Sequence, residues 1–317
     1  MREFASVSLR LLRFLHPYRW RVLGAYLAMT GATLLSLAVP AILGWSIDLA
    51  LGTGGGASLL TRLPGVASLL ARLDLGGRKA LLVAAALLLA IALLRGLLNL
   101  AETYLGAWLG QRVAYDLRNA FFNHLQRLSF GFHDRAQSGD LMSRAIGDIG
   151  KIQTFLGEGL LEAVNVPILF AAVGGILLWR APALALASLG PLLILVLVTL
   201  RFGQVIEPRF RAVQDQEGVI ATRAQENFTG MRVVKAFARE PFEIARYAEE
   251  NDVFLRRRIR AIHAFADFFP TMNAIVVLAL VLTLLVGGGQ VLAGQLSVGS
   301  LASIAFWITQ LGPPTQN

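Results

Sequence analysis

Continuous apolar stretches alternate with charged stretches along this chain. Five apolar runs cover residues 22–51, 81–94, 160–179, 183–200 and 274–286. Charged residues crowd two intervening segments, 111–151 and 201–267. Because the hydrocarbon core of a bilayer is about 30 Å thick and takes about 20 helical residues, the pattern predicts membrane-spanning helices joined by two long polar excursions.

The runs predict an all-α membrane protein with six spans and long cytoplasmic helical extensions. Expected spans cover about residues 20–51, 79–107, 156–180, 183–201 and 265–286, followed by an incomplete sixth span at 300–317. A membrane barrel fits the runs poorly, because its strands read as alternating segments of about ten residues, whereas these runs are continuous and rich in Leu and Ala. The second span has no strong helix breaker from Lys79 to Phe130, which predicts a rod of about 78 Å at 1.5 Å per residue.

Local turn chemistry predicts how the excursions reverse. We expect residues 131–139 to turn the chain, with Gly139 in left-handed geometry. Asp140 is then placed to cap the returning helix, and Arg144 and Asp148 are spaced for an ion pair along it. Gly230 is expected to end or bend a helix.

The N-terminal residues 1–16 predict a separate amphipathic helix. Leu9, Leu12 and Leu15 recur at helical spacing and suit an elbow helix lying on the inner leaflet, which Pro17 turns into the first span. The apolar run that follows is too long for a cleaved signal peptide. A short helix is also expected at about residues 59–73.

Composition supports a membrane protein and narrows its chemistry. Hydrophobic residues make up 56% of the chain and charged residues 15%, below the roughly 25% typical of soluble domains. The absence of cysteine excludes disulfides and thiolate chemistry. Most of the 29 Lys and Arg residues lie near the N-terminus and in the two excursions, so the positive-inside rule assigns these segments to the cytoplasm. The net charge of +9 therefore reflects membrane topology rather than nucleic-acid binding.

Several motifs lie in the two predicted cytoplasmic excursions and in the predicted outer loop before the last span. They read RVAYDLR at 112–118, HLQRLS at 124–129, FHD at 132–134, GDLMSR at 139–144, ENFTGMRVVKAFARE at 226–240 and GQLSVG at 294–299, with Pro313 and Pro314 near the end. In order and spacing they make the chain resemble the transmembrane domain of ATP-binding cassette (ABC) exporters, from Leu9 to Pro314.

The resemblance implies two short coupling helices, at about residues 132–137 and 228–235, that dock on nucleotide-binding domains. The residues it implicates are Phe132, His133, Asp134, Arg135, Phe228, Arg232 and Lys235. It further implies a dimer of transmembrane domains, homo- or heteromeric, that exports an amphipathic or hydrophobic cargo such as a lipid, drug or peptide. A multi-pass protein of a prokaryotic plasma membrane, with a cytoplasmic N-terminus, is expected. The alternative is that both tips are simple solvated turns.

The ATPase machinery of that family is not expected on this chain. No GxxxxGK[ST] loop, which would bind phosphates, occurs in the sequence. Residues 76–80 read GGRKA, which is only a weak match because no Ser or Thr follows the lysine. The four histidines do not have metal-ligand spacing. We expect ATP and Mg²⁺ to bind a nucleotide-binding domain that lies on a missing C-terminal portion or on a separate subunit, and no cofactor or metal to bind here.

Charged residues inside spans are candidate cargo contacts, because such residues are costly in lipid. Arg95, Asn99 and Glu102 share one face of the second span, with Trp108 further in, and Glu158 and Glu162 share a face of the third. The two faces could line a cavity, with an Arg–carboxylate pair between them. That pair is either structural or part of cargo binding.

Two other function classes remain open from the residues alone. An ion-coupled transporter should have interrupted helices and internal repeats; no repeat is visible, although Pro167 and Gly174 could break the third span. A nonenzymatic membrane scaffold is the other alternative.

Overall fold

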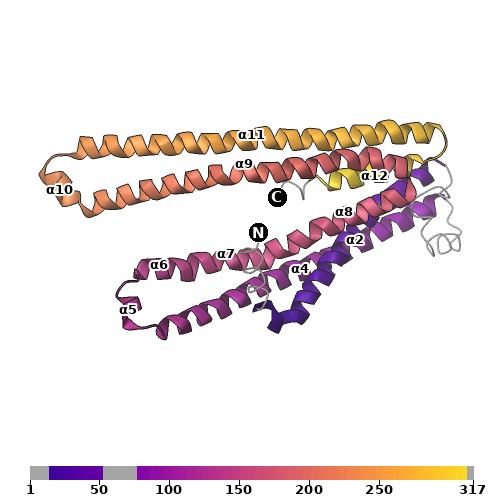
Figure 1. Cartoon of the computed structure of the whole chain (residues 1–317). Helices are drawn as coiled ribbons and strands as arrows, with labels where there is room; N and C mark the ends of the chain where they lie inside the picture. The colour runs from indigo at the N-terminus through magenta and orange to yellow at the C-terminus, as the bar shows by residue number, and fades with distance from the viewer. Residues whose placement is uncertain (1–13, 53–76, 313–317) are drawn as a thin grey trace. The chain divides into compact units, whose positions relative to one another are not determined.

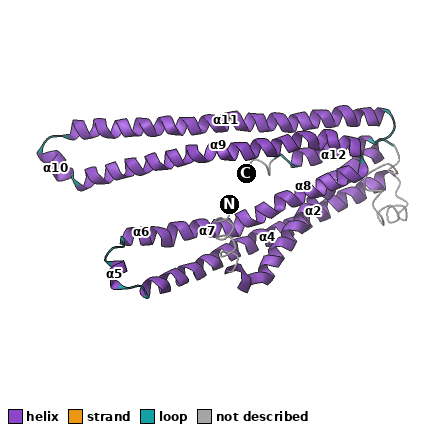
Figure 2. Cartoon of the chain, in the orientation of Figure 1, coloured by secondary structure: helices purple, strands orange, loops and turns teal. Residues whose placement is uncertain are grey.

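Helices and the turns between them make up the described part of the chain. The computed structural model describes residues 14–52 and 77–312 (Figures 1 and 2). No strand occurs within these ranges, and five of their helices are long and apolar enough to cross a membrane. The prediction of an all-α membrane protein is confirmed.

The helical elements follow one another through short connections. In chain order they are η1 (His16–Tyr18), α2 (Arg19–Ala50), α4 (Gly77–Gln126), α5 (Phe130–His133), α6 (Ser138–Ser143), η3 (Arg144–Asp148), α7 (Ile149–Thr154), η4 (Phe155–Gly159), α8 (Leu160–Arg180), α9 (Pro182–Thr229), α10 (Met231–Ala236), α11 (Glu240–Leu292) and α12 (Val298–Gln310). Only Ala181 separates α8 from α9, which is the tight turn that the sequence predicts. The α12 helix, with 13 residues, is shorter than the other apolar helices.

The chain divides into two compact units. The first comprises residues 1–182 and 287–307, and the second comprises residues 183–286 and 308–317. Each unit contains one long helical hairpin with a short helix at its tip (Figure 1).

In the first unit, α4 is a single rod of 50 residues, about 75 Å long at 1.5 Å per residue. The chain then turns at α5 and returns alongside α4 through consecutive helical segments from α6 to α8 (Figure 1). Two π-helical turns, η3 and η4, interrupt this returning rod. Pro167 does not break α8, which is helical throughout.

Glycines bring α4 into backbone contact with the consecutive helical segments α7 and η4. A Cβ atom added to Gly106 would lie 2.5 Å from the carbonyl oxygen of Gly157, and one added to Gly110 would lie 2.7 Å from that of Gln153. Neither distance is compatible with a real side chain. The α4 helix and these segments can cross this closely only because these positions lack side chains.

Aromatic and charged residues tie the start of α2 to α4. The Tyr18 hydroxyl donates to Asp116 Oδ2 at 2.6 Å and accepts from Arg112 Nε at 3.0 Å. The Arg21 guanidinium lies 3.6 Å from the ring centroid of Trp108, in cation–π geometry. Beside these contacts, Met29, Val113, Leu156 and other buried apolar residues of α2, α4 and η4 form a hydrophobic core.

The opposite end of α2 packs against the start of α12. Asp48 is buried and accepts hydrogen bonds from the Ser297 hydroxyl at 2.6 Å and from the Gly299 amide at 2.8 Å. A Cβ atom on Gly299 would lie 1.8 Å from the carbonyl oxygen of Gly44. A glycine pair and a buried carboxylate therefore connect the two helices.

The second unit is built on α9 and α11, which run side by side with α10 at their tip (Figure 1). The buried hydroxyls of Ser188 and Thr283 hydrogen-bond at 2.8 Å within the predicted spans. Further along the pair, the rings of Phe202 and Phe268 stack at 3.7 Å. The amide of Gln216 donates to Glu250 at 2.8 Å. These contacts hold the two rods together along much of their length.

Three expectations about the returning helix are wrong. Gly139 lies inside α6 without a positive φ. The N-cap residue is Gln137, and Asp140 lies in the first turn, where a carboxylate is favoured by the helix dipole. Arg144 pairs with Asp140 at 3.0 Å, whereas Asp148 pairs with Lys151 at 3.3 Å. An acidic residue four positions before a basic one is the favoured orientation on a helix, which accounts for the first of these pairs.

Some expectations fall outside the described residues. They concern most of the elbow helix (1–16), the short helix at about 59–73, and Pro313 and Pro314. The structure describes the chain from Phe14. His16 opens η1, Pro17 lies within it, and α2 begins directly after η1, at Arg19. Gly230 is the N-cap residue of α10 and directly follows the end of α9, as its predicted role requires.

Candidate functional sites at the helix tips and in the first unit

The tip of the first hairpin exposes two phenylalanines. Ser129, with extended backbone, ends the loop after α4 and precedes the four-residue helix α5. Phe130 is 89% exposed and Phe132 is 37% exposed. Apolar rings exposed at a polar tip are typical of a surface that is buried by a partner.

The predicted polar residues of this tip brace it internally. His133 Nε2 lies 3.1 Å from the carbonyl oxygen of Leu125. Arg135 Nε donates to the carbonyl oxygen of Gly131 at 2.9 Å. Asp134 is exposed, as are Phe130 and Phe132 of the same tip.

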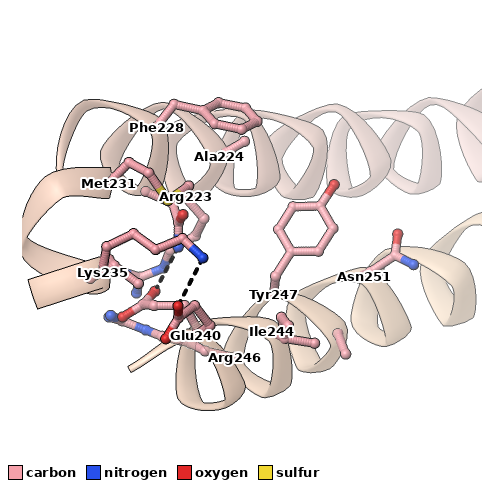
Figure 3. A pocket seen from close by; sticks show the side chains of 14 residues that line it. Arg223, Ala224, Phe228, Met231, Lys235, Glu240, Ile244, Arg246, Tyr247 and Asn251 are labelled. Carbon is pink, nitrogen blue, oxygen red and sulfur yellow. Dashed lines mark hydrogen bonds and ion pairs between the residues drawn. The ribbon is translucent and has the colours of Figure 1, made fainter. Parts of the chain in front are cut away.

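The tip of the second hairpin has a similar composition. Phe228 lies in the last turn of α9 rather than in the short helix, and is 74% exposed. Arg232 is exposed on α10. Lys235 is already engaged, because its Nζ atom lies 2.9 Å from Glu240 Oε1 (Figure 3). The hydrogen bond from Lys235 lowers the pKa of the Glu240 carboxyl from its ordinary value.

Sequence reasoning missed three exposed apolar residues at these tips. Phe130 belongs to α5, Val233 lies on α10, and Phe237 follows α10 directly. All three are more exposed than Phe132. The available signal was the same as for Phe132 and Phe228, namely a large apolar residue in a polar segment.

A small cavity in the first unit gathers three of the predicted cargo contacts. It has a volume of about 240 Å³ and is lined by Glu102, Glu158, Glu162 and four smaller or apolar residues. Gly157 also lines it, at the close crossing of α4 and η4. The cavity therefore forms where backbone contact leaves room beside the helices for carboxylates.

Arg95 and Asn99 do not line this cavity. Both are exposed on α4, and Arg95 forms no salt bridge with any other residue in 14–52 or 77–312. The prediction of an ion pair between Arg95 and a carboxylate is therefore wrong for the described residues. Trp108, on the same helix, packs against Tyr18 and Arg21 instead. The three glutamates do not form a metal-binding group within these ranges either.

The ABC transporter transmembrane region family matches residues 23–313 of this chain. The chain belongs to this family. As an ABC transporter transmembrane region it is an integral membrane protein, and the relationship inferred from its motifs is confirmed. The match favours neither the ion-coupled transporter nor the scaffold interpretation.

Three bacterial proteins are similar to this ABC transporter transmembrane region. It is 30% identical to the uncharacterized ABC transporter ATP-binding protein YknU of Bacillus subtilis over 72% of the chain and 39% of the relative. It is 27% identical to the putative multidrug export ATP-binding/permease protein YgaD of Bacillus subtilis over 98% of the chain and 51% of the relative. A putative multidrug export ATP-binding/permease protein of Staphylococcus aureus is 26% identical over 96% of the chain and 50% of the relative. The chain spans about half the length, or less, of these relatives.

Proposed function

We propose that this chain forms the membrane pathway of an ATP-driven exporter and couples ATP hydrolysis to the movement of an amphipathic or hydrophobic cargo. The observation that carries this proposal is the pair of long helical hairpins, each ending in a short helix with exposed aromatic residues on it or directly beside it. Two relatives have names that combine multidrug export, ATP binding and a permease, which supports the same activity for a larger assembly that contains this chain.

The geometry supports mechanical coupling. The helices α4, α9 and α11 each continue without interruption from an apolar half into a polar half, over 50, 48 and 53 residues. A force applied at α5 or α10 is transmitted along such a rod into the membrane, because hydrogen-bonded helices move as rigid bodies in domain and subunit rearrangements. Alternating access of the cargo pathway is the expected result.

The proposed partners follow from the same arrangement. Nucleotide-binding domains dock on the two tips and supply the ATP and Mg²⁺ sites. A second transmembrane domain, identical or different, completes the pathway, and membrane lipid surrounds the apolar faces. The basic N-terminus and the basic excursions support a cytoplasmic location for both tips, and the bacterial relatives support the plasma membrane of a prokaryote.

The docking role is tested by replacing Phe132 and Phe228 separately with Ala in the assembly that contains the nucleotide-binding domains. Truncating an aromatic anchor at an interface costs about 2 kcal/mol or more, which corresponds to a roughly 30-fold weaker contact. We expect ATP hydrolysis to continue while dye export from vesicles falls, so that less cargo moves per ATP. Hydrolysis and export are measured on the same vesicles.

The control for this test is Phe122→Ala. Phe122 is 61% exposed, but it lies on the shaft of α4 rather than at the tip. Its replacement should leave the ratio of export to hydrolysis unchanged. An unchanged ratio in both tip variants would rule out the docking role.

We further propose that Glu102, Glu158 and Glu162 contact cargo in the small cavity, and that Arg95 and Asn99 line the pathway at another level of α4. Glu102→Gln should change the concentration of an amphipathic dye at half-maximal export, and Arg95→Gln should do so independently, because the two residues form no pair. Export rates are measured against dye concentration, with Glu249→Gln on the polar part of α11 as the control. A purely structural role predicts a lower thermal stability with unchanged half-saturation.

A further inference from the structure

Charge is distributed unevenly along the pair formed by α9 and α11 in the second unit (Figure 1). Residues 200–214 of α9 and 255–269 of α11, which adjoin the predicted spans, contain seven arginines and two acidic residues. Residues 215–229 and 240–254, which lie toward the tip, contain eight acidic residues and two arginines. We call the arginine-rich part, residues 200–214 and 255–269, the basic band. A surface dominated by one sign of charge attracts a partner of the opposite sign.

The basic band lies at the level expected for lipid headgroups. At 1.5 Å per residue, Arg209 lies about 12 Å beyond the predicted span that ends at 201, and Arg260 lies about 8 Å from the one that begins at 265. Headgroups add about 5–8 Å to each side of the hydrocarbon core. The Cα–Cβ bonds of a helix tilt toward its N-terminus, which in α9 is the membrane end, so the Arg209 side chain leans back toward the bilayer.

Hydrogen bonds to backbone carbonyls bring arginines of the two helices together. Arg209 Nη1 donates to the carbonyl oxygen of Arg260 at 3.5 Å, and Arg257 Nη1 donates to that of Ala212 at 2.9 Å. None of these three arginines forms a salt bridge with a residue in 14–52 or 77–312. A guanidinium has five N–H donors, so one carbonyl contact leaves donors for an anion. Phosphate fits this need, because it accepts bidentate hydrogen bonds from arginine.

The carboxylates near these arginines do not neutralise them. Two carboxylates are paired with other arginines, Glu207 with Arg211 and Asp252 with Arg256. Asp267, at the membrane end of the basic band, and Asp215, where the acidic part begins, form no salt bridge with any arginine of the described residues. The basic band therefore keeps an excess of positive charge after its own ion pairs have formed.

We propose that the basic band binds the phosphate of an anionic membrane lipid, with Arg209 and Arg260, both exposed, as its main contacts. Leu197 and Leu200 are exposed on α9 directly beyond the band and offer contacts to acyl chains, which a soluble anion lacks. This inference rests on the cytoplasmic location proposed above for the polar halves of the helices. Its test measures lipid binding rather than export, so its failure is distinguishable from a failure of the proposed coupling.

The test is the dissociation constant of the full chain for phosphatidylglycerol, measured by native mass spectrometry in an uncharged detergent. An arginine near an anionic membrane surface contributes about fivefold to affinity, so the double replacement Arg209→Gln and Arg260→Gln should weaken binding about 25-fold. The double replacement of the same two residues with Lys should retain most of the affinity, because it preserves both charges. Zwitterionic phosphatidylcholine should bind weakly to every variant.

The matched control is the double replacement Arg211→Gln and Arg256→Gln. It removes the same charge from the same two helices, but both arginines already have carboxylate partners. Its affinity for phosphatidylglycerol should stay close to that of the unmodified chain. Equal weakening in the two Gln pairs would mean that net charge alone attracts the lipid, and it would overturn the proposed site.

Two measurements on the unmodified chain do not depend on the folding of a variant. Equal affinities for phosphatidylglycerol and phosphatidylcholine would overturn the proposal. Inorganic phosphate should displace phosphatidylglycerol no better than chloride does at the same ionic strength; selective displacement by phosphate would identify a soluble anion as the ligand instead. A change of oligomeric state in the Arg209→Gln and Arg260→Gln variant, with unchanged lipid affinity, would assign the basic band to a contact between copies of the chain and would also overturn the proposal.

Discussion

At the scale of single residues, glycines decide how closely the helices of the first unit approach. Gly106 and Gly110 on α4 face the η4 turn, where Gly157 also lacks a side chain. Glu102, Glu158 and Glu162 line a cavity beside this contact, and Gly157 borders it. The geometry of the candidate cargo site therefore depends on glycines, which have no side chain that could bind cargo.

Replacement of Gly106 with Ala should destabilise the protein. The added methyl group would lie 2.5 Å from a backbone carbonyl oxygen that cannot move without shifting η4, and overpacking of this kind costs roughly 1–3 kcal/mol. Thermal unfolding in detergent, followed by tryptophan fluorescence, measures the change.

Gly96→Ala is the matched control for this change. Gly96 is on the same helix, but an added Cβ atom there meets nothing within 4 Å. Alanine is also the better helix former, so the melting temperature should stay equal or rise slightly. Equal melting temperatures for the two variants would show that α4 and η4 do not cross as closely as described.

The sequence predicted part of the candidate site at this scale. Phe132 and Phe228 could be identified because large apolar residues are unexpected in polar segments. The ion pair between Lys235 and Glu240 could not be predicted, because it depends on the turn between α10 and α11. The free state of Arg95 was also unpredictable, because it depends on which residues of other helices reach α4.

At the scale of elements, an aromatic cluster joins α9 to α11. Phe202 stacks on Phe268 at 3.7 Å, and Phe265 meets both Phe202 and Phe210 edge-on. These contacts lie near the border between the predicted spans and the polar parts of both helices. They are placed to keep the two rods in register where lipid no longer surrounds them.

Replacement of Phe268 with Ala should weaken this pairing strongly. Phe268 is buried, and truncation of a buried phenylalanine costs about 3–5 kcal/mol. Phe242→Ala on the same helix is the control; that ring is half exposed and contacts Arg239, so its loss should cost about 1 kcal/mol. Denaturant unfolding of both variants gives the two values. Similar losses would contradict a stabilising role for the cluster.

The sequence predicted the ends of the long helix α4 closely, but it did not predict the π-helical turns. The long helix α4 was expected from Lys79 to Phe130 and is observed from Gly77 to Gln126, because helix length depends mainly on the absence of Pro and on clear turn residues at the ends. The π-helical turns η3 and η4 gave no such signal. The η4 turn lies against α4, a contact between distant parts of the chain that no local pattern encodes.

At the scale of the whole molecule, family membership and hairpin architecture together support an exporter. The ABC transporter transmembrane region match extends over residues 23–313, while the chain matches only about half, or less, of the length of these relatives. The proposed coupling therefore concerns an assembly larger than these 317 residues. Within the chain, each unit contains a long helical hairpin with a short helix at its tip.

The sequence by itself determined the helical class, the positions of the apolar runs and the family, because these depend on hydrophobic composition, chain-local propensity and motif order. Only the tertiary structure decided which charges pair, where the helices touch and which pockets form. These features depend on contacts between residues far apart along the chain, such as Gly106 with Gly157 and Asn227 with Glu243. Local patterns constrain which face of a helix is apolar, but the register between neighbouring helices is set by packing.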